Sequence, residues 1–196
     1  MLDPRFVIFG ALLNLFGSGA YIRDTLRGQT RPNRVSWLLW SIAPMIAFGG
    51  EIGEHVGIQA LTTFMAGFCP LLVLTTSFVN RKAYWQLTRF DIGCGILSLC
   101  AVVLWAITRT GNIAIIFSVL ADGLAATPTI IKSYRHPDTE SSIAFLASGT
   151  SGVITLLTIH SWTFALAAFP IYLVLCNAVI FTLTKFPRFR LNRSFQ

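Results

Sequence analysis

One carboxylate interrupts the apolar stretch Leu120-Ala121-Asp122-Gly123-Leu124-Ala125-Ala126-Thr127-Pro128-Thr129-Ile130, and basic residues follow it. A related stretch lies 108 residues earlier, Leu12-Leu13-Asn14-Leu15-Phe16-Gly17-Ser18-Gly19-Ala20-Tyr21-Ile22, and arginines follow it too. At this offset Asn14 aligns with Asp122, Ile22 with Ile130, Arg27 with Arg135, Val35 with Ile143 and Trp37 with Phe145. Self-similarity at a fixed offset predicts a repeated structural unit.

The composition predicts an integral membrane protein of the all-α class. The 196 residues are 54% hydrophobic and 12% charged, with a mean hydropathy of +0.67. A water-soluble core of this size could not hide that much apolar surface. A membrane-spanning helix needs about 20 apolar residues, and runs that are apolar on every face indicate helices rather than barrel strands. We predict seven spans: Phe6–Ile22, Val35–Gly50, Val56–Val79, Ile92–Thr108, Ile113–Ile131, Ile143–His160 and Trp162–Thr184.

The basic residues predict how the chain crosses the membrane. All but Arg5 and Arg109 of the 15 Lys and Arg residues fall on one side of the predicted spans. The positive-inside rule then places the N-terminus outside and the C-terminus in the cytoplasm, which requires an odd number of spans. A bacterial inner membrane is the simplest location. Because topology accounts for the net charge of +7, the sequence gives no reason to expect a nucleic-acid partner.

A second pair of matching segments divides the chain. Cys69-Pro70-Leu71-Leu72 and Phe169-Pro170-Ile171-Tyr172 lie 100 residues apart in the third and seventh spans. We therefore expect a first three-helix bundle over residues 1–80, a linking helix over 81–110, and a second bundle with a basic tail over 111–196. Two units separated by one span have the same orientation, so they are predicted to be parallel repeats about an axis along the membrane normal.

This layout resembles the PQ-loop superfamily of membrane transporters, which includes the SWEET-like (MtN3/saliva) proteins, the lysosomal cystine exporter and the KDEL receptor. The resemblance covers essentially the whole chain and is strongest at Asp122, Pro128 and the predicted loop Lys132-Ser133-Tyr134-Arg135-His136. The Pro-Gln pair of that superfamily reads Ala20-Tyr21 in the first unit and Pro128-Thr129 in the second. The resemblance implies solute transport, and it implies proton coupling at Asp122.

Asp122 is the leading candidate for a functional residue. A carboxylate near the middle of a span costs roughly 2.5–3.5 kcal/mol to insert, so it is expected to face a partner or a water-filled cavity. A proton relay or a counter-charge for a cationic substrate would use it. The alternative is a protonated structural aspartic acid that hydrogen-bonds a neighbouring helix.

Four further residues are candidates for substrate contact: Asn14, Trp40, Ser148 and Asn177. Asn14 occupies the place of Asp122 in the first unit, and Ser148 that of Trp40 in the second. The resemblance implies that Asn177 faces substrate, because sugar-transporting members place an asparagine there; a helix–helix hydrogen bond is the alternative. Trp37, near the start of the second span, is expected to be an interfacial anchor.

The sequence favours a small polar solute transporter that works by alternating access between the two bundles. Pro44, Pro70, Pro128 and Pro170 are expected to kink their helices, as hinges or as static bends. No catalytic set, metal-ligand spacing or cofactor motif is present, so we expect neither an enzyme nor a metal or cofactor. The alternatives are a receptor or assembly factor of the KDEL-receptor type and a structural subunit. The expected partners are a small polar solute and the lipid bilayer, and a homo-oligomer is left open.

Overall fold

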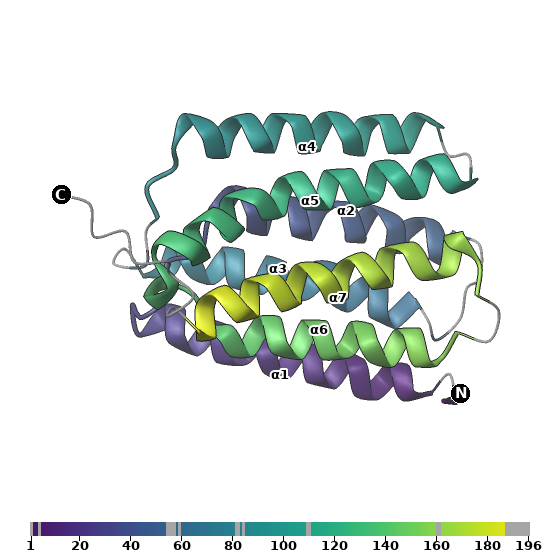
Figure 1. Ribbon diagram of the computed structural model, residues 1–196, viewed down its shortest axis with the longest axis horizontal. Helices are drawn as coiled ribbons and strands as arrows, with labels where there is room; N and C mark the ends of the chain where they lie inside the picture. Colours follow the sequence, from purple (N-terminus) through teal and green to yellow (C-terminus); the bar gives the residue numbers. More distant parts are fainter. Residues whose placement is uncertain are drawn as a thin grey trace.

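The computed structural model describes residues 2–3, 5–53, 58, 60–80, 83, 85–108, 111–159 and 162–186, which are entirely helical apart from turns and connecting segments (Figure 1). The helices of this part of the chain are α1 (Phe6–Leu26), α2 (Arg34–Gly53), α3 (Ala60–Val79), α4 (Arg89–Thr108), α5 (Gly111–Arg135), the 3-10 helix η3 (Pro137–Thr139), α6 (Ser142–Leu157) and α7 (Phe164–Lys185). The all-α prediction is confirmed, and a helix covers most of each predicted span.

The helices run side by side and alternate in direction, so the bundle has two ends (Figure 1). α1 packs against α3 and α6, while α3 also packs against α2. α7 packs against α5 and α6, and α2 contacts α5. α4 lies on α5 and touches α2.

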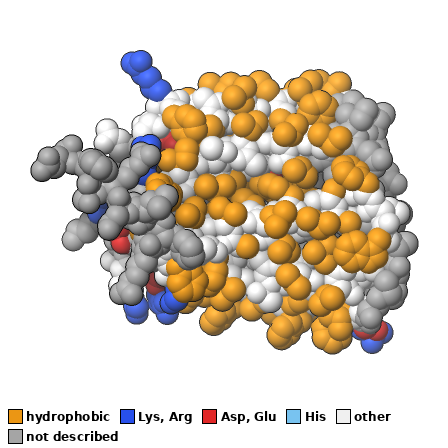
Figure 2. Space-filling model, viewed as in Figure 1, with side chains coloured by type: hydrophobic (Ala, Val, Ile, Leu, Met, Phe, Trp, Pro, Cys, Tyr) orange, Lys and Arg blue, Asp and Glu red, His pale blue; other side chains and the backbone are white. Residues whose placement is uncertain are grey.

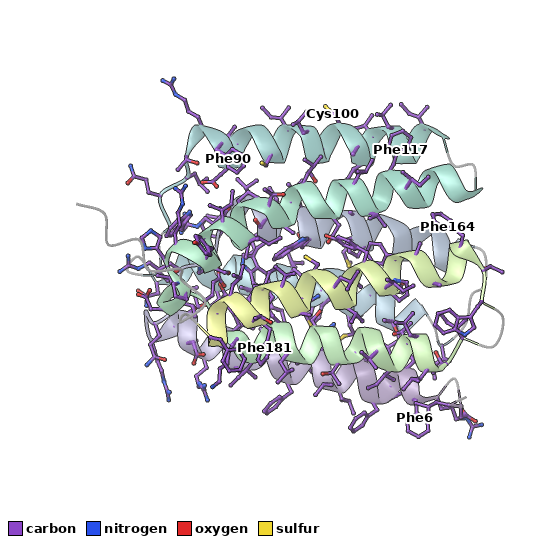
Figure 3. The ribbon with its side chains drawn as sticks, in the orientation of Figure 1. Phe6, Phe90, Cys100, Phe117, Phe164 and Phe181 are labelled. Carbon is purple, nitrogen blue, oxygen red and sulfur yellow. The ribbon has the colours of Figure 1, made fainter. Side chains whose placement is uncertain are left out.

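Apolar side chains are spread over the length of the face that Figure 2 shows, and Lys and Arg side chains lie near the ends of the bundle. α1, residues Leu61–Val79 of α3 and residues Ala167–Lys185 of α7 are long and apolar enough to cross a membrane. Large apolar side chains such as Phe16 and Ile107 are exposed on α1 and α4. Cys100, also exposed, lies on the outward side of α4 (Figure 3). Exposed apolar surface of this extent is typical of contact with lipid.

Two predictions about local structure are wrong. Residues Lys132–Arg135 form the last turn of α5 rather than a loop. The Lys132 side chain bonds Arg31 and Glu140, and these bonds hold the turn in place. Trp37 is not an interfacial anchor: it is 5% exposed, because Tyr21 and Phe145 enclose its ring in the core. Pro44, Pro70, Pro128 and Pro170 all lie inside helices, as predicted, and the kinks expected at them stay predictions.

α1 and α6 approach closely because small residues line their contact. A Cβ atom added to Gly17 would lie 2.5 Å from the Cβ of Ala147 and 3.2 Å from the Cα of Ala144. Gly19, two residues along the same helix, has no atom within 4 Å of such a Cβ. Small residues of this kind let two helix backbones pack tightly in a membrane protein.

We expect Gly17→Ala to destabilise the protein by about 1–3 kcal/mol, because an added methyl group would force α1 and α6 apart. Gly19→Ala is the matched control and should have little effect. Thermal unfolding of both variants in detergent tests this. Equal melting temperatures for the two variants would contradict the close approach of α1 and α6.

Candidate functional site

A hydrogen-bonded pair of half-buried side chains lies between α5 and α7. Asp122 is near the midpoint of α5, and its Oδ2 atom accepts a hydrogen bond of 2.7 Å from the hydroxyl of Tyr172 on α7. The described ion pairs are Arg23 with Asp24 and Lys132 with Glu140. Within the described residues, therefore, Asp122 has a hydrogen-bond donor but no basic side chain in ion-pair contact.

Trp40 of α2 reaches this pair from across the bundle. The hydroxyl of Thr129 donates to the hydroxyl of Ser36 at 2.9 Å, which sets the register of α5 against α2. Trp40 lies after Ser36 on α2, and Asp122 lies before Thr129 on α5. Because the two helices run in opposite directions, Trp40 and Asp122 lie on the same side of this contact. The Trp40 indole lies beside the Asp122 carboxyl, and its N–H has no partner that meets hydrogen-bond geometry in the described part of the chain.

Tyr172, which bonds Asp122, and Cys176 on the same helix were not among the predicted site residues. They are four residues apart on α7, so one face of that helix presents both of them. The Cys176 side chain lies beside that of Tyr172. Their spacing was visible in the sequence, but nothing in the sequence identified α5 as the helix that this face meets.

Asn177, Asn14 and Ser148 lie elsewhere. Asn177 is buried, donates to the backbone oxygen of Leu173 at 2.9 Å and faces Gly149 of α6. Its described hydrogen bond thus stays within α7 rather than joining two helices. Asn14 and Ser148 are half-buried on α1 and α6. The structure brings Asp122 and Trp40 together, and no described contact connects the other three to that pair.

A second polar cluster closes one end of the bundle. Glu140 follows η3 and accepts two hydrogen bonds, one of 2.7 Å from the Tyr21 hydroxyl and one of 2.5 Å from the Lys132 ammonium group. Lys132 also donates to the backbone oxygen of Arg31, and the Arg31 N–H donates to the Thr139 oxygen at 2.9 Å. We call these five residues the basic-end network, since exposed arginines such as Arg27, at the end of α1, lie at the same end of the bundle.

The ion pair inside this network is completely shielded from water. The side chains of Lys132 and Glu140 are 1% and 0% exposed. The ring of Trp85, just before α4, lies 5.0 Å from the Lys132 ammonium group. A buried charge is tolerated when it is paired and its remaining donors are hydrogen-bonded, and both conditions hold here.

Comparison of the chain with protein families, curated proteins and solved structures finds no match in any of the three.

Proposed function

We propose that this chain is a seven-span membrane transporter for a small polar solute, rather than an enzyme, and that it moves the solute between two three-helix units. The first unit comprises α1 to α3, the second comprises α5 to α7, and α4 links them. The contacts between helices support this division. The third helix of each unit contacts the other two, and the units meet through α1 with α6 and α2 with α5. A two-fold axis along the membrane normal would exchange these two contacts.

The central aromatic residues also support a two-fold relation between the units. Trp37 and Phe145 are equivalent at the offset of 108 residues, and their ring centroids lie 6.4 Å apart. Residues next to a two-fold axis face their own equivalents. The axis would then pass between these two rings, in the centre of the bundle.

The transport proposal rests mainly on the position of Asp122 inside a predicted span. An ionisable group inside a span marks a solute or proton pathway by default. Because Tyr172 and Trp40 surround it without a described basic partner, the carboxylate suits a solute that brings a positive charge or several hydrogen-bond donors. Such a solute could exchange with a proton at Asp122, or pass by facilitated diffusion.

The proposed orientation follows the charges. The described ends of α1 and α5 that carry Arg23, Arg27 and Arg135 lie at one end of the bundle. The positive-inside rule would place this end in the cytoplasm and the N-terminus outside. A bacterial inner membrane is the proposed location, as the resemblance to PQ-loop transporters permits.

A thermal-shift screen of the purified protein in detergent tests the proposal. We would add glucose, lysine, ethanolamine and thiamine at two pH values and then measure flux of any stabilising compound into proteoliposomes. A ligand at one hundred times its Kd should stabilise the fold by about 2.7 kcal/mol. Stabilisation with flux supports a transporter. Stabilisation without flux points to a receptor of the KDEL-receptor type, and the absence of both favours a structural subunit.

A further inference from the structure

The basic-end network joins the two proposed units to each other. The bond from Tyr21 to Glu140 runs from the first unit to the second. The bonds from Lys132 to Arg31 and from Arg31 to Thr139 also cross between them. So does the bond of 3.1 Å that the Ser141 hydroxyl donates to Asp24.

Aromatic side chains fill the space next to this network, toward the middle of the bundle. The ring centroids of Tyr21 and Trp37 lie 4.8 Å apart, and those of Tyr21 and Phe145 lie 6.4 Å apart. Tyr21 is 0% exposed. Its ring thus belongs to the aromatic core while its hydroxyl belongs to the network, so one residue connects the two layers.

The polar character of this contact suits an interface that separates and closes again. Buried ion pairs are weak contributors to stability compared with apolar residues of the same size. Water can, however, hydrogen-bond Tyr21, Lys132 and Glu140 once the units part, whereas newly exposed apolar groups would have no such compensation. An interface built from these side chains can therefore open at a lower cost than an apolar one.

We propose that Tyr21, Lys132 and Glu140 form a latch that holds the two units together at the basic end and closes the Asp122 site to water on that side. This inference rests on the proposed transport function, because a latch has a role only if the site must open. Release of the latch exposes the path from the basic end to Asp122, Tyr172 and Cys176.

Cys176 is a suitable reporter for this path, since it lies one turn along α7 from Tyr172, which bonds Asp122. The test uses a background in which Cys69, Cys94 and Cys100 are replaced by Ala, so that Cys176 is the sole cysteine, reconstituted in nanodiscs. The measured quantity is the rate at which a membrane-impermeant maleimide labels Cys176. Tyr21→Phe removes the bond to Glu140 and keeps the ring. It should raise this rate about tenfold, the size expected when a hydrogen bond to a charged group is lost.

Thr25→Val is the matched control. The Thr25 hydroxyl is buried and bonds the Tyr21 backbone oxygen at 2.8 Å and Thr30 at 2.7 Å, so its hydrogen bonds stay within the first unit. It should leave the labelling rate unchanged even if it lowers the melting temperature. If Thr25→Val and Tyr21→Phe change the rate equally, or if neither changes it, the network is structural and the latch is disproved.

A crosslink provides a test that leaves the network intact. The hydroxyls of Ser36 and Thr129 lie 2.9 Å apart across the same interface, so Ser36→Cys/Thr129→Cys should form a disulfide that locks the basic end. Because this variant adds two thiols, labelling is measured on the peptide that contains Cys176. Oxidation should slow Cys176 labelling by about tenfold or more, and reduction followed by removal of the reductant should restore it. An unchanged rate after complete oxidation would overturn the latch. Neither experiment needs a solute, so failure of the latch and failure to find a transported compound are distinguishable.

Discussion

Asp122→Asn is expected to remove the ligand-dependent stabilisation and the solute flux that the proposed function predicts for the wild-type protein. The variant keeps an oxygen that can accept from Tyr172, so the contact between α5 and α7 survives while the negative charge is lost. A hydrogen bond to a charged group contributes about 1.5–3 kcal/mol, and its loss corresponds to roughly ten- to hundredfold weaker binding. The measurements are the thermal shift in detergent and flux into proteoliposomes.

Two controls accompany Asp122→Asn. Asp138→Asn makes the same chemical change at an exposed position on η3 and should behave like wild type. Tyr172→Phe keeps the charge and removes one hydroxyl, so we expect it to reduce binding less than Asp122→Asn does. If Asp122→Asn binds and transports like wild type, this carboxyl group is structural and the solute pathway lies elsewhere.

Lys132→Met is expected to destabilise the protein by about 3–5 kcal/mol, because Glu140 would remain buried without its cation. The double variant Lys132→Met/Glu140→Gln removes both charges and should recover most of that loss. Unfolding in SDS–detergent mixtures measures both variants. A single variant no less stable than the double one would mean that water reaches Glu140 in the folded protein.

The exposed ion pair between Arg23 and Asp24 is the control for this comparison. The Arg23 side chain is 54% exposed, and exposed pairs contribute at most about 1 kcal/mol. Arg23→Met should therefore change stability far less than Lys132→Met, although both substitutions remove one basic partner of one ion pair.

The sequence was informative about the helices and much less so about which side chains meet. Hydropathy predicts helices because each backbone group in lipid must bond within its own helix, and this requirement is local. Asp122 stood out because a carboxylate in an apolar run is costly whatever surrounds it. Its partner Tyr172 did not stand out, because a tyrosine in a span is unremarkable until the packing of α5 against α7 is known.

The basic-end network shows the same difference. Lys132 was predicted to lie in a loop, since basic residues follow most spans on one side, and Glu140 was not singled out. Their burial depends on the bonds to Arg31 and Tyr21, more than a hundred residues away in the chain. Trp37 was misassigned for a related reason: its place near a helix end suggested the interface, whereas contacts with Phe145 put it in the core.

The partners of α5 also bear on how the chain is made. Among the described residues, three helices are long and apolar enough to cross a membrane, and α5 is not one of them. α5 carries both Asp122 and Lys132. Glu140 and Tyr172 lie C-terminal to α5, so a ribosome exposes them after α5 has emerged. During synthesis α5 would therefore enter the translocon with both side chains unpaired. At that stage only α4, which precedes α5 and packs against it, could stabilise α5. Its insertion would be completed only when α7 arrives, so nascent chains truncated before α7 should be the ones that quality-control proteases remove.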